Sequence, residues 1–186
     1  MSDYMAAEIT LGGPVPKRLV GPLCAAINKE GVSLQWGGTS FSPTSAKHLL
    51  AARCQDERGV SVLRLYAEEK PYGTFELLEK FLCRHGLSFR RYCDGKYEYD
   101  PEIIEYRPAL GMVRYLAARN GEPHVPLTAL RASQEAVAGA IALLGQRRAA
   151  HALRHLKKLL GDQRKYLPPE VPPLEAFEVV SRGRRA

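Results

Sequence analysis

Apolar residues recur every three to four positions in three segments of the N-terminal half, and residues typical of helix ends bound each segment. Pro22 is typical of a first helical turn, and Gly31 is typical of the position after a helix. Ser42 and Thr74 are common N-cap residues, and each precedes an apolar stripe. The pattern therefore predicts three helices, at 22–30, 43–54 and 75–85.

Short runs of β-branched and aromatic residues lie between and after these helices. The runs are VSLQW at 32–36, VSVLRLY at 60–66 and LSFRRYC at 87–93. Helices that alternate with strands through short connections favour parallel strands joined by right-handed crossovers. The first 122 residues thus predict an α-β-α-β-α-β order. Residues 1–16 show little periodicity and are interpreted as an irregular N-terminal arm.

A dense polar stretch follows the third strand. Asp94-Gly95 is typical of a type I′ hairpin turn, so 96–100 is expected to return antiparallel to 87–93. A two-residue loop would place Arg91 opposite Glu98 and Tyr92 opposite Tyr97, which are favourable cross-strand pairs. Further edge strands are expected at 103–106 and 112–118.

The C-terminal third changes pattern. Apolar residues at helical spacing predict a helix at 127–144 and a second helix at 147–160, which together form a helical pair. Four prolines in 166–173 indicate a semi-rigid linker, and LEAFEVV at 174–180 is expected to add an edge strand.

The resulting hypothesis is an α/β fold with a small mixed, mainly parallel sheet, extended by an antiparallel hairpin and followed by a C-terminal helical pair. The expected divisions are an arm at 1–16, an α/β domain at 17–122, a helical hairpin at 123–165, and a Pro-rich segment with a basic tail at 166–186.

The net charge of +7 is concentrated near the C-terminus, because 147–165 holds seven Lys/Arg residues against one Asp. A helix with such a face attracts phosphates without reading sequence. The residues expected to contact nucleic acid are Arg147, Arg148, Arg154, Lys157, Lys158, Arg164 and Lys165. A solvated basic helix face is the alternative interpretation of the same residues.

The hairpin is the second candidate site, because Tyr and Arg are enriched at binding hot spots. The residues expected to bind a protein partner are Arg91, Tyr92, Lys96, Tyr97 and Tyr99.

A third candidate lies at the edge where the predicted parallel strands end, since ligands of open α/β sheets usually bind there. Glycines before the helix capped by Ser42 would offer backbone amides to an anion. The residues of this candidate anion-binding edge are Gly38, Thr39, Ser42, Lys70, Tyr72 and Asp94.

The four cysteines and five histidines have no spacing typical of a metal site, and no catalytic motif was recognised, so no metal or cofactor is expected. No apolar run approaches the ~18 residues of a membrane-spanning helix, and the N-terminus lacks a secretory pattern; a cytoplasmic location is expected.

The sequence thus favours a non-enzymatic cytoplasmic accessory or adaptor protein that binds a protein partner, nucleic acid or both. One alternative is a protein–protein inhibitor or assembly factor that docks on an acidic partner. Another is a small enzyme that acts on an anionic or phosphorylated substrate at the candidate edge.

Overall fold

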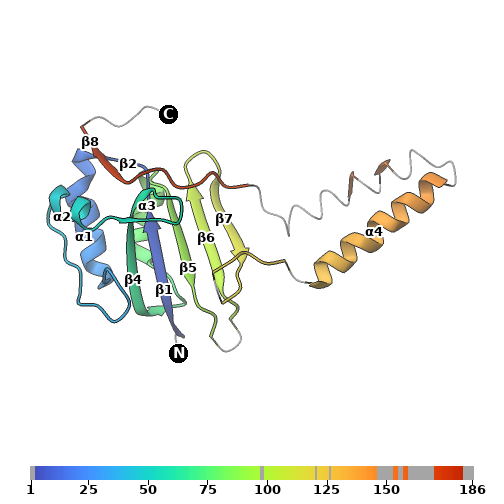
Figure 1. The fold of residues 1–186 in the computed structure, drawn as a ribbon, viewed down its shortest axis with the longest axis horizontal. Helices are drawn as coiled ribbons and strands as arrows, with labels where there is room; N and C mark the ends of the chain where they lie inside the picture. Colours follow the sequence, from blue (N-terminus) through green and yellow to red (C-terminus); the bar gives the residue numbers. More distant parts are fainter. Residues whose placement is uncertain are drawn as a thin grey trace. The chain divides into compact units, whose positions relative to one another are not determined.

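The computed structural model describes residues 3–96, 99–119, 121–125, 127–145, 153–154, 157–158 and 170–181. The chain forms two compact units (Figure 1). The first unit comprises Met1–Glu122 together with Val171–Ala186, and the second comprises Pro123–Glu170. Each unit is described by itself below.

The first unit is built on a six-stranded sheet in which neighbouring strands are antiparallel. Its strand order is β3-β4-β1-β5-β6-β7. The strands are β1 (Tyr4–Leu11), β3 (Cys54–Gln55), β4 (Ser61–Pro71), β5 (Phe89–Cys93), β6 (Glu102–Arg107) and β7 (Gly111–Leu116). A separate two-stranded parallel ribbon joins β2 (Pro14–Pro16) to β8 (Glu178–Val180).

The prediction of a mainly parallel sheet is wrong, and the reason is β1. This strand occupies part of the expected N-terminal arm and pairs antiparallel with both β4 and β5. Strands β4 and β5 therefore run in the same direction, as a crossover through a helix requires, but β1 lies between them. Met5, Ala7, Ile9 and Leu11 are all buried, so the alternation that marks a strand is present in this segment.

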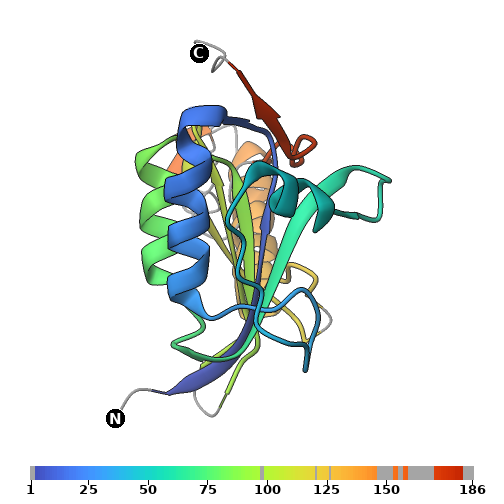
Figure 2. The same cartoon turned by 90° about the vertical axis from the view of Figure 1, so that its left-hand side faces the viewer.

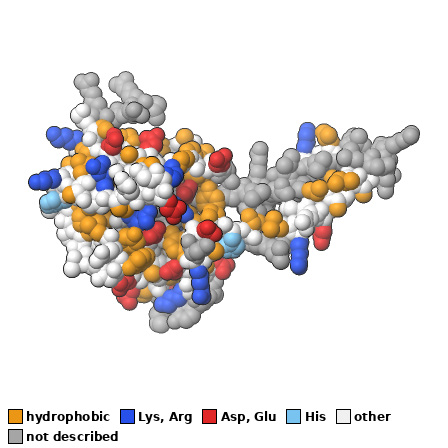
Figure 3. All heavy atoms as spheres, in the orientation of Figure 1, with side chains coloured by type: hydrophobic (Ala, Val, Ile, Leu, Met, Phe, Trp, Pro, Cys, Tyr) orange, Lys and Arg blue, Asp and Glu red, His pale blue; other side chains and the backbone are white. Residues whose placement is uncertain are grey.

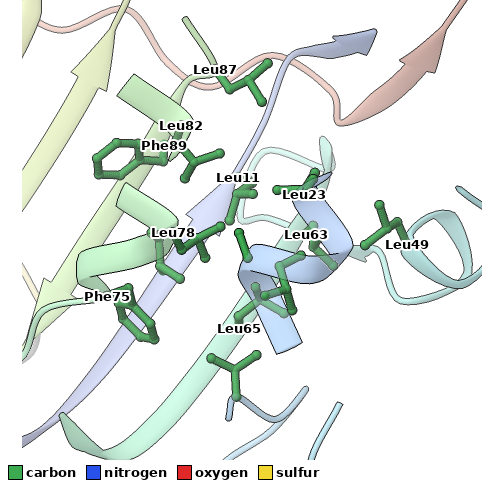
Figure 4. Packing of buried hydrophobic residues seen from close by; sticks show 14 of the residues in the cluster. Leu11, Leu23, Leu49, Leu63, Leu65, Phe75, Leu78, Leu82, Leu87 and Phe89 are labelled. Carbon is green, nitrogen blue, oxygen red and sulfur yellow. The ribbon is translucent and has the colours of Figure 1, made fainter. Parts of the chain in front are cut away.

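Helices α1 (Val20–Glu30) and α3 (Glu76–Arg84) lie side by side on one face of the sheet (Figure 2). A short 3₁₀ turn, η1 (Lys17–Leu19), precedes α1. The predicted end of α1 is confirmed, because Gly31 has the left-handed φ of 62° that terminates a helix. Leu23 and Leu78 from the two helices pack with Leu11, Leu65 and other strand residues into one apolar core (Figure 4).

Two predicted elements between α1 and β4 are corrected. The expected strand at 32–36 is reduced to Ser33, which forms isolated bridges with Ser40 and Tyr66. The next helix, α2, is limited to Ala46–Ala51, and its N-cap is Ser45, whose side chain accepts from the His48 amide. Ser42 is therefore not a helix cap.

The start of α3 also differs from the prediction. Its N-cap residue is Phe75, and the Thr74 hydroxyl donates to the Pro71 carbonyl at 2.9 Å. The Phe75 amide donates instead to the Glu79 carboxylate at 2.9 Å, as in the reciprocal half of a capping box.

The hairpin after β5 exists, but with a longer loop than expected. Strand β5 pairs with β6, so that Arg91 lies opposite Ile104 and Tyr92 opposite Ile103. Gly95 is not among the glycines with positive φ, so 94–95 is not a type I′ turn, which requires positive φ at both residues. Glu98, the predicted partner of Arg91, lies outside the described residues.

The second unit contains α4 (Leu127–Gly145), which confirms the first helix of the predicted pair. Of the second predicted helix, 153–154 and 157–158 are described and helical; the rest lies outside the described residues. None of the helices described in the chain is long and apolar enough to cross a membrane.

The C-terminal segment at 171–181 belongs to the first unit rather than forming a free tail. Phe177 is fully buried in the core, and the Phe177 amide donates to the Ser61 carbonyl at 2.8 Å. Strand β8 follows immediately, which confirms the expected edge strand in 174–180 over three residues.

Candidate functional site

The face of the sheet opposite α1 and α3, here called the open face, presents polar side chains from four adjacent strands. Alternation along each strand decides which residues stand there, because successive side chains point to opposite sides. In β1, Ile9 and Leu11 face the helices, so Glu8 and Thr10 stand on the open face. Basic and acidic side chains are intermixed over the sheet in Figure 3.

Strand register places these side chains in two rows. In the first row, Thr10 pairs with both Arg64 and Arg90, and Arg90 pairs with Glu105. In the second row, Glu8 pairs with both Tyr66 and Tyr92. Two arginines thus flank a hydroxyl, and two tyrosines flank a carboxylate in the adjacent row. The tyrosine row continues through Ile103 to Tyr115 on β7.

The arginine row forms the floor of a cavity of about 310 Å³. Its walls come from the 56–58 loop and from the C-terminal segment. The lining residues are Glu8, Thr10, Asp56, Glu57, Arg58, Arg64, Arg90, Glu105, Arg107, Pro173 and Leu174. This volume is at the lower end of the range for small-molecule sites, and it suits one small polar group.

Two of the lining arginines hold the C-terminal segment in place. Arg107 Nε donates to the Pro172 carbonyl at 2.8 Å, and its Nη1 donates to the Phe89 carbonyl at 2.9 Å. Arg58 Nη2 donates to the Leu174 carbonyl at 3.0 Å and to Asp56 at 2.7 Å. These guanidinium groups already have acceptors, so they form the wall of the cavity.

Arg90 and Glu105 have protein partners for only part of their hydrogen-bonding groups. Arg90 Nη2 donates to the Gly121 carbonyl at 3.1 Å, and its Nε lies 3.7 Å from Glu105 Oε1. Glu105 Oε2 also lies 3.8 Å from Arg107 Nη2. Burial raises the pKa of Glu105 despite the attraction of both arginines, so this carboxylate is incompletely compensated.

The Glu8 carboxylate and the Nε of Arg64 are two groups of the cavity to which no described residue forms a hydrogen bond. Among the described residues, no side chain or amide donates a hydrogen bond to the Glu8 carboxylate, and no cation lies within ion-pair distance of it. Burial raises the pKa of Glu8 although Arg64 and Arg90 attract its charged form. Arg64 Nε is buried, and no described residue accepts a hydrogen bond from it. A buried N–H group without an acceptor, such as Arg64 Nε, is unusual in native proteins and calls for an explanation.

The tyrosine row is held rigidly. The Tyr92 hydroxyl donates to Asp94 Oδ1 at 2.7 Å and lies 3.1 Å from the Arg119 carbonyl oxygen. Burial and the neighbouring Asp94 raise the pKa of Tyr92, so it remains a neutral phenol. Tyr66 packs against Trp36 with ring centroids 4.9 Å apart, and Trp36 is 46% exposed. The aromatic surface therefore extends beyond the edge of β4.

The residues predicted to bind a partner divide between the two faces. Arg91 is 1% exposed and is enclosed by Glu79 and Glu102 on the helix-covered face, so it is not presented to a partner. Tyr92 belongs to the open face. Lys96 and Tyr99 pair with each other in the hairpin loop and are exposed, whereas Tyr97 lies outside the described residues.

The loops of the predicted anion-binding edge do lie close together. Gly38 lines a cavity of about 440 Å³ that also contains Glu68 and Glu69. Asp94 and Lys96 line a neighbouring cavity of about 230 Å³, to which the same two glutamates contribute. The charged residues of the two linings are mainly acidic, which disfavours an anion.

The remaining residues of that edge lie outside the lining of these two cavities. Thr39 and Ser42 are exposed and line neither cavity. Lys70 is 8% exposed, and its ammonium group donates to the carboxylate and the carbonyl of Glu30. Tyr72 has a left-handed φ of 53° and packs edge-on against Tyr99, with ring centroids 6.1 Å apart.

The predicted nucleic-acid contacts are only partly described. Arg154, Lys157 and Lys158 are helical and exposed in the second unit. The other predicted residues, Arg147, Arg148, Arg164 and Lys165, lie outside the described residues. No group of His, Cys, Asp and Glu side chains suited to a metal ion occurs in the described parts of the chain.

The residues of the open face were missed by reasoning from the sequence. Arg64 and Tyr66 lie within the strand that was predicted most clearly, where alternation places them on one face. Glu8 and Thr10 lie in the segment that was taken as an irregular arm. The usable signal was the alternation in YMAAEITL, but only the register shows which side chains become neighbours.

The chain matches no protein-family model and no curated protein, and its fold matches no solved structure.

Proposed function

We propose that this protein is a non-enzymatic cytoplasmic accessory protein that binds single-stranded nucleic acid on the open face of its sheet. The observation that carries the proposal is the pair of adjacent rows, in which Arg64 and Arg90 stand beside Tyr66 and Tyr92. Proteins that bind single strands combine cationic groups for the backbone with aromatic side chains on which bases stack. Trp36 extends the aromatic surface at its exposed end.

The open face favours a single strand over a duplex. In a duplex the faces of the bases are stacked on each other, so aromatic side chains on a sheet have no base to contact. Glu8 and Glu105 also weaken the attraction of this face for phosphate alone. Unpaired bases gain from the tyrosines, which offsets that repulsion.

The exposed cations of the second unit supply attraction that does not depend on sequence. Each phosphate neutralised on a single strand contributes a slope of about −0.7 to the dependence of log K on log salt. Arg154, Lys157 and Lys158 are each helical and exposed. Replacing all three by Glu should weaken binding and make the slope less negative by about 2.

The test uses the full chain, a fluorescent single-stranded oligonucleotide of about 12 nucleotides, and the matching duplex, across a salt series. The matched control replaces Lys29, Lys47 and Arg84 by Glu, which changes the net charge equally at exposed positions elsewhere. We expect the single strand to bind more tightly than the duplex, and the control to lose less affinity than the first triple variant. Binding of neither nucleic acid would refute the proposal.

A protein partner is the second candidate function, and it is favoured by edge strand β7. Met112 is 53% exposed and Leu116 is 38% exposed on this strand, beside Leu110 at 42%. Exposed apolar residues on an edge strand are typical of protein contacts. A partner that is retained from a lysate after nuclease treatment, and lost when Met112 is replaced by Glu, would favour this second function.

A further inference from the structure

The cavity on the open face contains the Glu8 carboxylate and the buried Nε of Arg64, and no described residue forms a hydrogen bond with either group. Glu8 offers two carboxylate oxygens, and Arg64 offers guanidinium N–H groups that include the buried Nε. The two residues lie in adjacent rows of neighbouring strands, because Glu8 pairs with Tyr66 and Thr10 pairs with Arg64. Burial lowers the pKa of Arg64, but its side-chain interaction with Tyr66 and the attraction of Glu8 raise it, so that the net shift is upward.

Most of the other charged groups of the cavity have protein partners. Arg58 and Arg107 hold the carbonyls of the C-terminal segment, and Arg90 holds the Gly121 carbonyl through one of its N–H groups. Glu105 is shared between two arginines, and Glu57 is exposed. A ligand that lies against Glu8 and Arg64 must present donors to the carboxylate and acceptors to the guanidinium group.

We infer that the cavity holds one unpaired guanine base, with Glu8 accepting from its N1–H and N2–H₂ groups and Arg64 donating to its O6 and N7 atoms. The inference rests on the proposed function and narrows it to a substrate class. Among the four bases, guanine has two adjacent donors that match a carboxylate, and its O6 and N7 form the acceptor pair that arginine binds most often. Adenine and cytosine each offer one amino donor, and thymine offers a single imide N–H.

The tyrosine row borders the cavity. Tyr66 and Tyr92 are the in-register neighbours of Glu8 on either side, and neither lines the cavity itself. A base held by Glu8 and Arg64 therefore lies beside this row, where the next bases of the same strand can stack on the tyrosines.

The first experiment needs no protein variant. Oligothymidines of about 12 nucleotides that carry one central guanine, hypoxanthine, 7-deazaguanine, adenine or cytosine are compared for affinity to the full chain. Hypoxanthine lacks the 2-amino group that Glu8 would accept from, and 7-deazaguanine lacks the N7 atom that Arg64 would donate to. We expect guanine to bind best and each of these analogues to lose about tenfold in affinity.

Two variants test which residue contacts which edge of the guanine base. Glu8→Gln should remove the difference between guanine and hypoxanthine, and Glu69→Gln, an exposed carboxylate outside this cavity, should retain it. Arg64→Lys keeps the charge but loses the bidentate geometry, so it should remove the difference between guanine and 7-deazaguanine. Thermal unfolding of each variant shows whether it is folded.

Competition with guanosine and inosine monophosphates shows whether the cavity binds a free nucleotide or a nucleotide within a strand. A preference for guanosine monophosphate over inosine monophosphate supports the guanine site. Tighter binding of the oligonucleotide than of the free nucleotide shows that a strand supplies the guanine. Equal affinity for all the oligonucleotides would overturn the guanine site and leave the proposed function standing. Binding of the guanine nucleotide without any strand would overturn the proposed function alone, and binding of neither would overturn both.

Discussion

At the scale of the residue, the Glu8 carboxylate is a side chain of the open face that does not serve the stability of the fold. It is half-buried, and no described residue donates a hydrogen bond to it. A half-buried carboxylate without partners destabilises the folded state, because the charged form loses part of its hydration and gains no hydrogen bond in return. Stability would favour a neutral residue at this position, so its presence agrees with a role in binding.

The direction in which burial shifts the pKa of Glu8 determines how the stability of the protein depends on pH. Burial raises the pKa of Glu8 in the folded state above its ordinary value of 4.5, so the folded protein binds this proton more tightly than the unfolded chain. The favourable contribution of the protonated group is complete below pH 4.5 and is lost as the pH rises through the folded-state pKa.

Glu8→Gln is therefore expected to increase the free energy of unfolding at about pH 7, because the amide carries no charge to desolvate. The gain should shrink as the pH falls toward 4.5. Urea denaturation of both proteins across this range measures the difference. A less stable variant at neutral pH would mean that attraction to Arg64 outweighs the cost of burying the carboxylate.

At the scale of the element, Arg91 links β5 to three other parts of the first unit. Its Nη2 donates to Glu102 on β6 at 2.6 Å, and its Nη1 donates to the Gly73 carbonyl at 2.6 Å. Its Nε lies 3.1 Å from Glu79 Oε1 on α3, without the geometry of a hydrogen bond. Burial raises the pKa of Glu79 against the attraction of Arg91, so this carboxylate depends on the arginine.

Replacing Arg91 by Met should reduce the free energy of unfolding by about 3–5 kcal/mol, because Glu79 would lose its cation and Glu102 would keep the exposed Arg114 in its place. Arg114 provides the control, since it binds Glu102 Oε2 at 3.0 Å but is 69% exposed. Arg114→Met should cost less than about 1 kcal/mol. Chemical denaturation of both variants gives the comparison, and similar small losses would show that Arg91 is dispensable for stability.

At the scale of the whole molecule, the first unit is completed by residues from both ends of the chain. Strand β1 lies in the centre of the sheet, and the segment at 171–181 packs against the loops that precede β4. Phe177 is fully buried within the apolar core, and Arg53 Nη1 donates to its carbonyl at 3.2 Å. The unit is thus closed by a contact between residues more than a hundred positions apart.

Phe177→Ala should therefore destabilise the first unit by about 3–5 kcal/mol, as expected for the loss of a buried aromatic ring. Leu110→Ala provides the control, because Leu110 is 42% exposed and its removal leaves no cavity. Denaturant unfolding followed by far-ultraviolet circular dichroism measures both losses. An effect of Phe177→Ala no larger than that of the control would show that the C-terminal segment contributes little to the unit.

The sequence by itself determined most elements with a strong local signal. Helical spacing and a glycine able to adopt positive φ identified α1, and alternation of apolar residues identified β4 and β5. These signals are local because hydrogen bonds within a helix, and the two sides of a strand, involve residues close in the chain. Ser42 and Asp94-Gly95 were misread for the same reason, since the same residues serve several kinds of turn.

Only the tertiary structure decided the order of the strands and the composition of the open face. The alternation within β1 is compatible with a central or an edge position and with either direction of pairing, so it does not specify that β1 separates β4 from β5. Glu8, Arg64 and Arg90 come from three strands and become neighbours only through register. Register depends on burying one complete face of every strand at once, which is a property of the assembled sheet and not of any single segment.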